Sequence, residues 1–388
     1  MKPIYPAKLE QWWLDQARKL TGIGDIVPCL ASLEKDVERL SDLFTIQRSV
    51  RFGEYARDER MVLAYGLFFF PQNFVRVQLV LDELSVLRGF RLPSDRPLRI
   101  LDLGCGSGAA TFAALTHLAT AAPGLPVAVH AVDASRRFLN VMEQLFEAKH
   151  ELWPTALLRA EEGDLLGSGA DADIIFVSFA LNEVMESRGG DDLAGLSRLL
   201  GRLSPGGVLV ILEPVSQVTS ERLERFRDWV AENKSVRILG PCLHHSACPL
   251  LKRGDVWCHE VRRWRIPETL EILNRRLFRS IEDLKFSFLA LERSEVPEVS
   301  AAGPDVFRMI APMRKLKGKL VTAGCAADGG ARTYEMLSRG LDRPAEDHLI
   351  SFERGTVVRT IDLQPLADGK TLRVRKIERV FESAGEKW

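Results

Sequence analysis

The sequence feature that most constrains the fold is a glycine-rich turn that follows a short apolar run. The run covers residues 98–103, and the turn contains Gly104, Gly106 and Gly108 before a helix-forming stretch at 109–122. Glycine suits a sharp turn where the backbone approaches a ligand more closely than a Cβ atom allows. The free N–H groups at the start of the helix favour an anionic group. This strand–turn–helix pattern predicts a ligand-binding loop.

Strand and helix patterns continue to alternate after this turn. Apolar runs typical of buried strands occur at 127–132, 173–178 and 207–212, with helical stretches at 136–149 and 193–203. Such alternation is typical of a mainly parallel sheet that is covered by helices on both faces. We therefore expect an α/β domain over residues 96–235.

The flanking regions have a different character. Residues 1–95 place apolar residues at helical spacing and predict a helical N-terminal region. Residues 236–335 form a cysteine-rich segment, which we expect to be interwoven with the end of the sheet. Residues 336–388 form a β-rich C-terminal extension, in which strand-like runs at 356–361 and 371–377 are joined by an Asp-Gly turn that predicts a hairpin.

Charge and composition exclude several classes of protein. The chain has 388 residues, of which 46% are hydrophobic, and its 53 basic and 53 acidic side chains cancel. A disordered chain and a polycation that coats nucleic acid are thereby excluded. No apolar run approaches the roughly 20 residues that cross a bilayer, and no signal-peptide core is visible. We expect a cytoplasmic protein with no membrane partner and no DNA partner.

Two cofactors fit the glycine turn. The spacing Gly104-x-Gly106-x-x-Ala109 satisfies the dinucleotide pattern of NAD-binding folds. However, Asp102 precedes the first glycine by two residues, and Gly108 supplies a third glycine. With these two residues the segment resembles the S-adenosylmethionine loop of Rossmann-like methyltransferases.

Later residues favour the same cofactor. Asp133 closes the second strand and is expected to hold the ribose hydroxyls, as an acid at that position does in dinucleotide folds. Asp164 is a candidate for the adenine edge, and the turn LSPGG at 203–207 also resembles those methyltransferases. Glycines alone are compatible with a tight turn that binds nothing, but four features in this order favour S-adenosylmethionine, with NAD as the alternative.

The sequence assigns no catalytic residue. The methyl sulfonium is already activated, so a methyltransferase mainly aligns the acceptor with it. Amino-methylating enzymes of nucleic acids carry Asn/Asp-Pro-Pro-aromatic after the fourth strand, whereas this chain has Ser178, Phe179, Ala180, Leu181, Asn182 and Glu183 after 173–177. The pair at 182–183 either touches a substrate or caps a helix.

Four cysteines suggest a metal site. Five residues separate Cys242 from Cys248, nine separate Cys248 from Cys258, and Cys325 follows much later. Four thiolates close a zinc site or hold an iron–sulfur cluster. Zinc folds favour pairs separated by roughly two to four residues, so the irregular spacing favours a cluster. The alternative zinc site would recruit a nearby histidine: His244, His245 or His259.

Two further interpretations of the cysteines remain open. In the first, the four cysteines are small buried hydrophobic residues, as free cysteines often are. Alternatively, Cys242 is the nucleophile of an enzyme that forms 5-methylpyrimidines in RNA, although no resolving cysteine is evident.

The glycine loop and the cysteine segment together resemble the methyltransferase-like assembly factors of the small ribosomal subunit, found in bacteria and mitochondria. The resemblance extends from about residue 60 to residue 335. The motifs that carry it are AYGLFFFP at 64–71, GPCLHHSACP at 240–249, DVWCH at 255–259, EDLKFSFLAL at 282–291 and GCAADG at 324–329. The tail beyond about residue 340 departs from the family.

The resemblance implies a Rossmann-like class I methyltransferase domain with a helical N-terminal region and a cysteine-rich metal-binding segment, while the β-rich tail is expected from its strand-like runs alone. It implies that Cys242, Cys248, Cys258 and Cys325 bind a [4Fe–4S] cluster. The implied partner is small-subunit ribosomal RNA or a pre-ribosomal particle. Members of the family often have degraded glycine loops, whereas this loop is intact, and from the intact loop we expect methylation of RNA. The alternatives are a non-catalytic RNA-binding assembly factor, and a methyltransferase for a small molecule or protein with a structural metal site.

Two basic stretches flank the proposed ligands. Residues 252–279 contain eight basic and four acidic side chains, and residues 308–320 contain five basic side chains and no acidic one. We expect them to form one positive surface for RNA phosphates. The alternative is that they are ordinary solvated faces.

Overall fold

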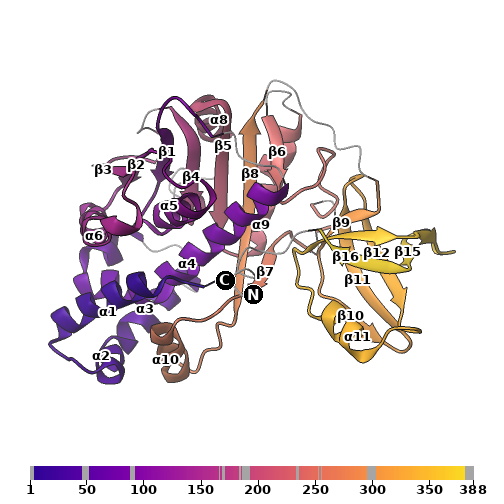
Figure 1. The fold of residues 1–388 in the computed structure, drawn as a ribbon, viewed down its shortest axis with the longest axis horizontal. Helices are drawn as coiled ribbons and strands as arrows, with labels where there is room; N and C mark the ends of the chain where they lie inside the picture. Colours follow the sequence, from indigo (N-terminus) through magenta and orange to yellow (C-terminus); the bar gives the residue numbers. More distant parts are fainter. Residues whose placement is uncertain are drawn as a thin grey trace.

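The computed structural model describes residues 4–45, 52–87, 92–165, 167, 171–182, 185, 193–232, 236–251, 253–254, 256–294 and 303–380. Two sheets organise these residues: a large one surrounded by helices, and a smaller one at the C-terminal end of the chain, drawn in yellow and orange in Figure 1. No helix within the described ranges is long and apolar enough to cross a membrane.

The first sheet has the strand order β3-β2-β1-β4-β5-β8-β6, and β7 extends it beside β8. Its first five strands run parallel, whereas β8 is antiparallel to both of its neighbours. The antiparallel strand between β5 and β6 gives a mixed sheet, the Rossmann-like methyltransferase arrangement. Its strands are β1 (Leu98–Leu103), β2 (Val127–Asp133), β3 (Ala156–Glu162), β4 (Ala172–Ser178), β5 (Leu203–Glu213), β6 (Val236–Gly240), β7 (Glu260–Arg263) and β8 (Asp283–Arg293).

Helices cover both faces of this sheet, as the alternation predicted. Ile100 and Val129 pack in one apolar core with α4, α5 and α6, and Leu101 and Ile175 pack in a second core with α8 and α9. The helices are α5 (Ala109–Ala121), α6 (Arg136–Ala148), α8 (Leu193–Gly201) and α9 (Gln217–Ala231), with the short η2 (His150–Leu152) after α6. The α/β fold class is confirmed.

A group of N-terminal helices packs against the first sheet. It comprises α1 (Ala7–Thr21), α2 (Ile26–Ser32), α3 (Glu34–Thr45), the short η1 (Phe52–Arg57) and α4 (Glu59–Leu87), with α10 (Glu268–Arg276) beside α2. Helix α4 continues through Pro71 and is buried along most of its length. It lies against α5 and reaches β8, so it spans much of one face of the sheet (Figure 1).

The second sheet has the order β14-β15-β12-β11-β9-β13-β16, with β10 beside β11. Its strands are β9 (Val306–Met309), β10 (Arg314–Leu316), β11 (Lys319–Ala326), β12 (Ala331–Leu337), β13 (Val357–Ile361), β14 (Gln364–Pro365), β15 (Thr371–Val374) and β16 (Lys376–Arg379), and α11 (Arg343–Ile350) precedes β13. The sheet joins residues on both sides of position 335, so the C-terminal extension and the end of the cysteine segment share one core.

The predicted hairpin differs in its pairing. The Asp-Gly turn closes β14 onto β15, whereas β13 pairs with β16 and β9. The run 371–377 is divided at Arg375, so its two halves pair with different neighbours. A short strand therefore lies between the two runs that we expected to pair directly.

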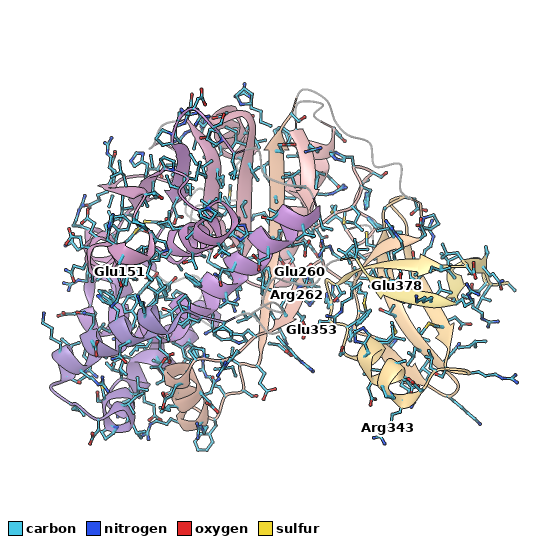
Figure 2. All side chains as sticks on the ribbon, viewed as in Figure 1. Glu151, Glu260, Arg262, Arg343, Glu353 and Glu378 are labelled. Carbon is cyan, nitrogen blue, oxygen red and sulfur yellow. The ribbon has the colours of Figure 1, made fainter. Side chains whose placement is uncertain are left out.

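The two sheets meet at β7. The backbone N–H of Arg263 donates to the carboxylate of Glu353, at 3.1 and 3.2 Å, and the Arg262 guanidinium donates to the carbonyl of Arg354 at 2.5 Å. Figure 2 shows Glu260, Arg262 and Glu353 close together at this junction. Ion pairs and backbone hydrogen bonds therefore fix the second sheet to the first.

Candidate cofactor pocket and cysteine cavity

The glycine turn lies at the carboxyl end of β1, and its three glycines have different roles. At Gly104 an added Cβ would lie 2.3 Å from the Cβ of Ala180, and at Gly108 it would lie 2.7 Å from the ring of Phe112. Packing therefore requires these two glycines. Gly106 also has a positive φ, +53°, but an added Cβ would meet nothing within 4 Å. The space in front of Gly106 is open for a ligand.

Asp133 fixes the turn from the neighbouring strand. Its carboxylate accepts hydrogen bonds from the backbone N–H groups of Gly106 and Ser135, both at 2.8 Å. Burial raises the pKa of Asp133. Both oxygens keep acceptor capacity, since a carboxylate has about four lone-pair sites. The structure therefore brings Asp133 directly beside the open glycine, where a ribose would be held.

Asp102 lies beneath the turn and is fully buried. Its Oδ2 accepts hydrogen bonds from the backbone N–H of Thr111 at 3.1 Å and from the Thr111 hydroxyl at 2.7 Å, while Oδ1 has no partner among the described residues. Burial raises the pKa of Asp102 to about 7. Asp102 ties β1 to the first turn of α5 and so holds both ends of the loop.

Asp164 is exposed just beyond β3. The preceding residue, Gly163, donates a backbone hydrogen bond to the carbonyl of Asp133 at 3.1 Å. The ends of β3 and β2 therefore lie side by side, and β1 follows β2 in the sheet. All six predicted cofactor residues are gathered at one edge: Asp102, Gly104, Gly106, Gly108, Asp133 and Asp164.

The segment after β4 completes this edge. Phe179 has φ +60°, in the left-handed region that a non-glycine residue seldom adopts, and such strain clusters at functional sites. The side-chain oxygen of Asn182 accepts a hydrogen bond from Arg222 at 2.6 Å. The backbone N–H of Asn182 donates to Glu213 at 3.3 Å. Asn182 is therefore held by the protein itself, and Glu183 lies outside the described residues.

Sequence analysis missed a polar group on α4 beside this edge. Tyr65, Gln72, Asn73 and Arg76 are linked by hydrogen bonds, and the Arg76 guanidinium lies over the ring of Phe179, 5.3 Å from its centroid. The available signal was the presence of polar residues at helical spacing in an otherwise apolar helix.

The four predicted cysteine ligands line a single cavity of about 40 Å³. They come from three segments: the loop after β6 carries Cys242 and Cys248, the approach to β7 carries Cys258, and β11 carries Cys325. By the same measure one water molecule needs roughly 10–15 Å³, so the cavity has room for a larger group. The structure therefore brings together cysteines that are widely separated in the sequence.

Two acids on α9 position the cysteine loops. The backbone N–H of Cys258 donates to Glu224 at 2.5 Å, and that of Cys248 donates to both oxygens of Asp228, at 2.8 and 3.1 Å. The guanidinium of Arg227, on the same helix, donates to the carbonyl of His244 at 2.7 Å. The contacts of these three α9 residues with the cysteine loops could not be predicted from the spacing along the chain.

The cavity disfavours free thiolates. Burial, followed by the nearby Cys242, raises the pKa of Cys248 to about 12 and raises those of Cys258 and Cys325 as well. A bound cation would favour the thiolate forms of these three cysteines.

Within the described ranges, no three His, Cys, Asp or Glu side chains converge closely enough to hold a single metal ion. The neighbouring histidines have other contacts. The Nε2 of His244 lies 3.5 Å from the sulfur of Cys325, and His245 accepts a hydrogen bond from the backbone of Ile238 at 3.3 Å. The Nδ1 of His259 lies 3.2 Å from the carbonyl of Trp257. The four cysteines therefore line a cavity.

The structure corrects the prediction of one positive surface. Arg308 is buried and pairs with Glu83 and Glu260, and Arg262 pairs with the same two acids. Arg276 pairs with Glu34 in the N-terminal helices. Arg308 and Arg262 therefore stabilise internal contacts, while Arg276 is 37% exposed beside its partner. The exposed part of the second stretch is β10 and the turn that follows it, with Arg314 and Lys315 on the strand and Lys317 in the turn.

Comparisons with solved structures return weak similarities. A precorrin-6y C5,15-methyltransferase from Geobacter metallireducens is 15% identical, with 56% of this chain and 89% of that chain covered and a TM-score of 0.33. A methyltransferase from Pyrococcus furiosus is 11% identical, with 57% and 83% covered and a TM-score of 0.32. TM-scores this low carry no argument, so the evidence for the fold is the strand order. A comparison with curated proteins finds no match.

The family comparison is decisive. The family model described as mitochondrial small ribosomal subunit Rsm22 matches residues 59–339. The matched range contains α4, the glycine turn, both sides of the cysteine cavity and the first strands of the second sheet. It covers well over half of the chain, and so the chain belongs to the Rsm22 family.

Proposed function

We propose that this protein is an S-adenosylmethionine-binding factor of small ribosomal subunit assembly that carries a [4Fe–4S] cluster and methylates RNA. The family description, which names the small ribosomal subunit, supports the ribosomal partner. The observation that carries the proposal is the presence of two sites within the residues that the family model matches: the open glycine turn and the four-cysteine cavity.

The residues at the strand edge fit S-adenosylmethionine. The space before Gly106 admits a ligand against the backbone, and Asp133 is oriented beside it. Asp164 is exposed at the adenine end, and Asp102, Gly104 and Gly108 shape the loop from below. The bound cofactor would supply an already activated methyl group, so the protein has to bind it, orient the acceptor and exclude water.

The cysteine geometry supports a cluster over zinc. A zinc ion draws its ligands to a single point, with sulfur atoms about 2.3 Å from the metal. In a [4Fe–4S] cluster each thiolate binds a different iron, so the four sulfur atoms stand around a larger body. The irregular spacing of the four cysteines and the cavity of about 40 Å³ that they line agree with the second arrangement. Cys242, Cys248, Cys258 and Cys325 would be its ligands.

A non-catalytic assembly factor is the second candidate, and one observation favours it. Asn182, the polar residue nearest the expected acceptor position after β4, is engaged by Arg222 and Glu213. In that case cofactor and cluster would stabilise an RNA-binding shape, and no methyl group would be transferred.

The test compares substitutions at two glycines that both have a positive φ. Gly106 and Gly124 both have positive φ and open space around an added Cβ, but Gly124 lies in the turn before β2, at the opposite edge of the sheet. Gly106→Asp should abolish binding of S-adenosylmethionine, whereas Gly124→Asp should retain it with a similar cost in stability. If both variants bind the cofactor like the natural protein, the site assignment is wrong.

Labelled S-adenosylmethionine then separates the two candidates. Transfer of the label to small-subunit precursor RNA, lost in Gly106→Asp and retained in Gly124→Asp, supports methylation. Cofactor binding and RNA binding without transfer would identify the non-catalytic factor. Cofactor binding that is indifferent to small-subunit RNA would contradict the ribosomal assignment.

A further inference from the structure

Helix α4 passes over the end of β1, where the glycine turn lies. The ring of Tyr65 packs against the ring of Phe138, which begins α6 just after β2, with centroids 5.3 Å apart. About three turns further along α4, Arg76 lies over Phe179, which directly follows β4. Since β1 lies between β2 and β4 in the sheet, the segment from Tyr65 to Arg76 spans the end of β1.

Arg76 is close to the cofactor loop. Phe179, whose ring it covers, is followed by Ala180, and the Cβ of Ala180 fills the space where a side chain at Gly104 would lie. The left-handed backbone of Phe179 is therefore held directly against the glycine turn. Phe179 and Ala180 therefore connect the Arg76 guanidinium to that turn.

The partners of Arg76 are all neutral. Its two terminal nitrogens donate to the side-chain oxygens of Asn73 at 2.6 Å and Gln72 at 3.3 Å, and Asn73 in turn donates to the Tyr65 hydroxyl at 3.1 Å. The Nε of Arg76 is buried and has no hydrogen-bond partner in the part of the chain that the structure describes. Burial lowers the pKa of Arg76 to about 10, the direction expected for a cation without an anion beside it.

Arg76, which is half-buried, differs in this respect from the buried arginines near the two sites. Arg308 pairs with Glu83 and Glu260, and Arg227 pairs with Asp228. No described carboxylate pairs with Arg76. A buried charge normally has a counterion, because desolvation is costly without one. The helix therefore presents a positively charged group that an anionic ligand would complete.

The proposed contacts give the ligand a direction along the sheet edge. Asp164 follows β3 at the adenine end, and Asp133 follows β2 at the ribose. The amino-acid end of the cofactor then extends over β1 toward β4, where Arg76 lies. A guanidinium is the group best suited to bind a carboxylate, since its planar donors match the two oxygens.

We propose that Arg76, positioned by Gln72 and Asn73, binds the carboxylate of the methionine portion of S-adenosylmethionine. This inference rests on the cofactor assignment made above. It makes α4 a wall of the cofactor pocket, and it makes the N-terminal helices part of the binding site rather than a separate cap.

The test compares two ligands that differ only at the carboxylate. S-adenosylmethionine and its decarboxylated form share the adenosine, the sulfonium and the amine. Isothermal titration calorimetry on the full chain measures both ligands with the natural protein, Arg76→Met and Arg76→Lys. The control is Arg60→Met, since Arg60 lies on the same helix but pairs with Asp36 on α3. Thermal unfolding of each variant checks that it folds.

Arg76→Met should weaken binding of S-adenosylmethionine by about 10- to 100-fold, the range for a lost hydrogen bond to a charged group, and leave the decarboxylated ligand unchanged. Arg76→Lys should recover part of the loss, and Arg60→Met should bind both ligands normally. Equal weakening of both ligands, or of neither, would overturn the proposal. Loss of RNA binding with normal cofactor binding would also overturn it and assign the guanidinium to an acceptor phosphate. If the natural protein binds neither ligand, the cofactor assignment itself fails.

Discussion

Glu83 of α4 and Arg308 of β9 form a buried ion pair between the N-terminal helices and the second sheet. The same guanidinium donates to the carbonyl of Pro241 at 2.6 Å, one residue before Cys242, and pairs with Glu260, two residues after Cys258. One network therefore connects α4, the cysteine cavity and the second sheet. Burial alone would raise the pKa of Glu83, but Arg308 and Arg262 outweigh it and hold that pKa below its usual range.

Arg308→Met tests this network. Removing the Arg308 guanidinium leaves the buried carboxylates of Glu83 and Glu260 with less positive charge beside them. The free energy of unfolding should therefore fall by about 3–5 kcal/mol. Arg343→Met is the control, because Arg343 is 92% exposed and its contact with Asp347 is 3.8 Å long. That variant should stay within about 0.5 kcal/mol of the natural protein. Chemical denaturation followed by circular dichroism measures both, and equal effects would contradict the network.

The pKa of Asp102 predicts a pH dependence of stability. Burial raises it to about 7, from an ordinary value of 3.8, so between these values the folded state holds a proton that the unfolded state has lost. This residue's contribution to stability is therefore fully present below about pH 4 and is lost as the pH rises toward 7, by up to about 1.4 kcal/mol per pH unit. Asp102→Asn should become more stable relative to the natural protein across this window. If the free energies of unfolding of the natural protein and of Asp102→Asn change in parallel from pH 4.5 to 7.5, the raised pKa of Asp102 is refuted.

The turn between β10 and β11 predicts where RNA binds. Lys317 is exposed in this turn, and Lys315 is exposed on β10, where it pairs with Glu346, whereas Arg308 of the same basic stretch is buried. Changing both lysines to Gln should weaken binding of small-subunit RNA and reduce the slope of log K against log salt by about two. The control changes two exposed arginines of the first sheet and its helices, Arg159 and Arg225, to Gln. A normal salt slope in the lysine variant would exclude this turn from the RNA surface.

Part of the fold was predictable because buried parallel strands are nearly continuous apolar runs. The runs at β1, β2, β4 and β5 have that composition and were recognised. Strand β3 was not, because it lies at the edge of the sheet and includes the charged residues Arg159, Glu161 and Glu162. The antiparallel position of β8 was also beyond prediction, since strand order depends on packing between distant segments.

The candidate site, like the fold, could be predicted only in part. Asp133 and the glycine turn were expected to meet, because parallel strands place their carboxyl ends at one edge. The roles of Arg76, Glu224 and Asp228 depend on which helix faces which loop, so spacing along the chain carries no sign of them. A count of basic residues along the chain does not predict a positive surface, because a basic residue such as Arg308 can be a buried ion-pair partner in the fold.

The most direct test of the account is the metal content of the anaerobically purified chain. We expect about four iron atoms and four sulfides per chain, with a charge-transfer absorption band. Cys258→Ser should lose them, whereas Cys29→Ser should keep them, because Cys29 is buried in the N-terminal helices away from the cavity. One zinc without sulfide, or no metal from the anaerobic preparation, would contradict the central claim that the four cysteines hold a cluster.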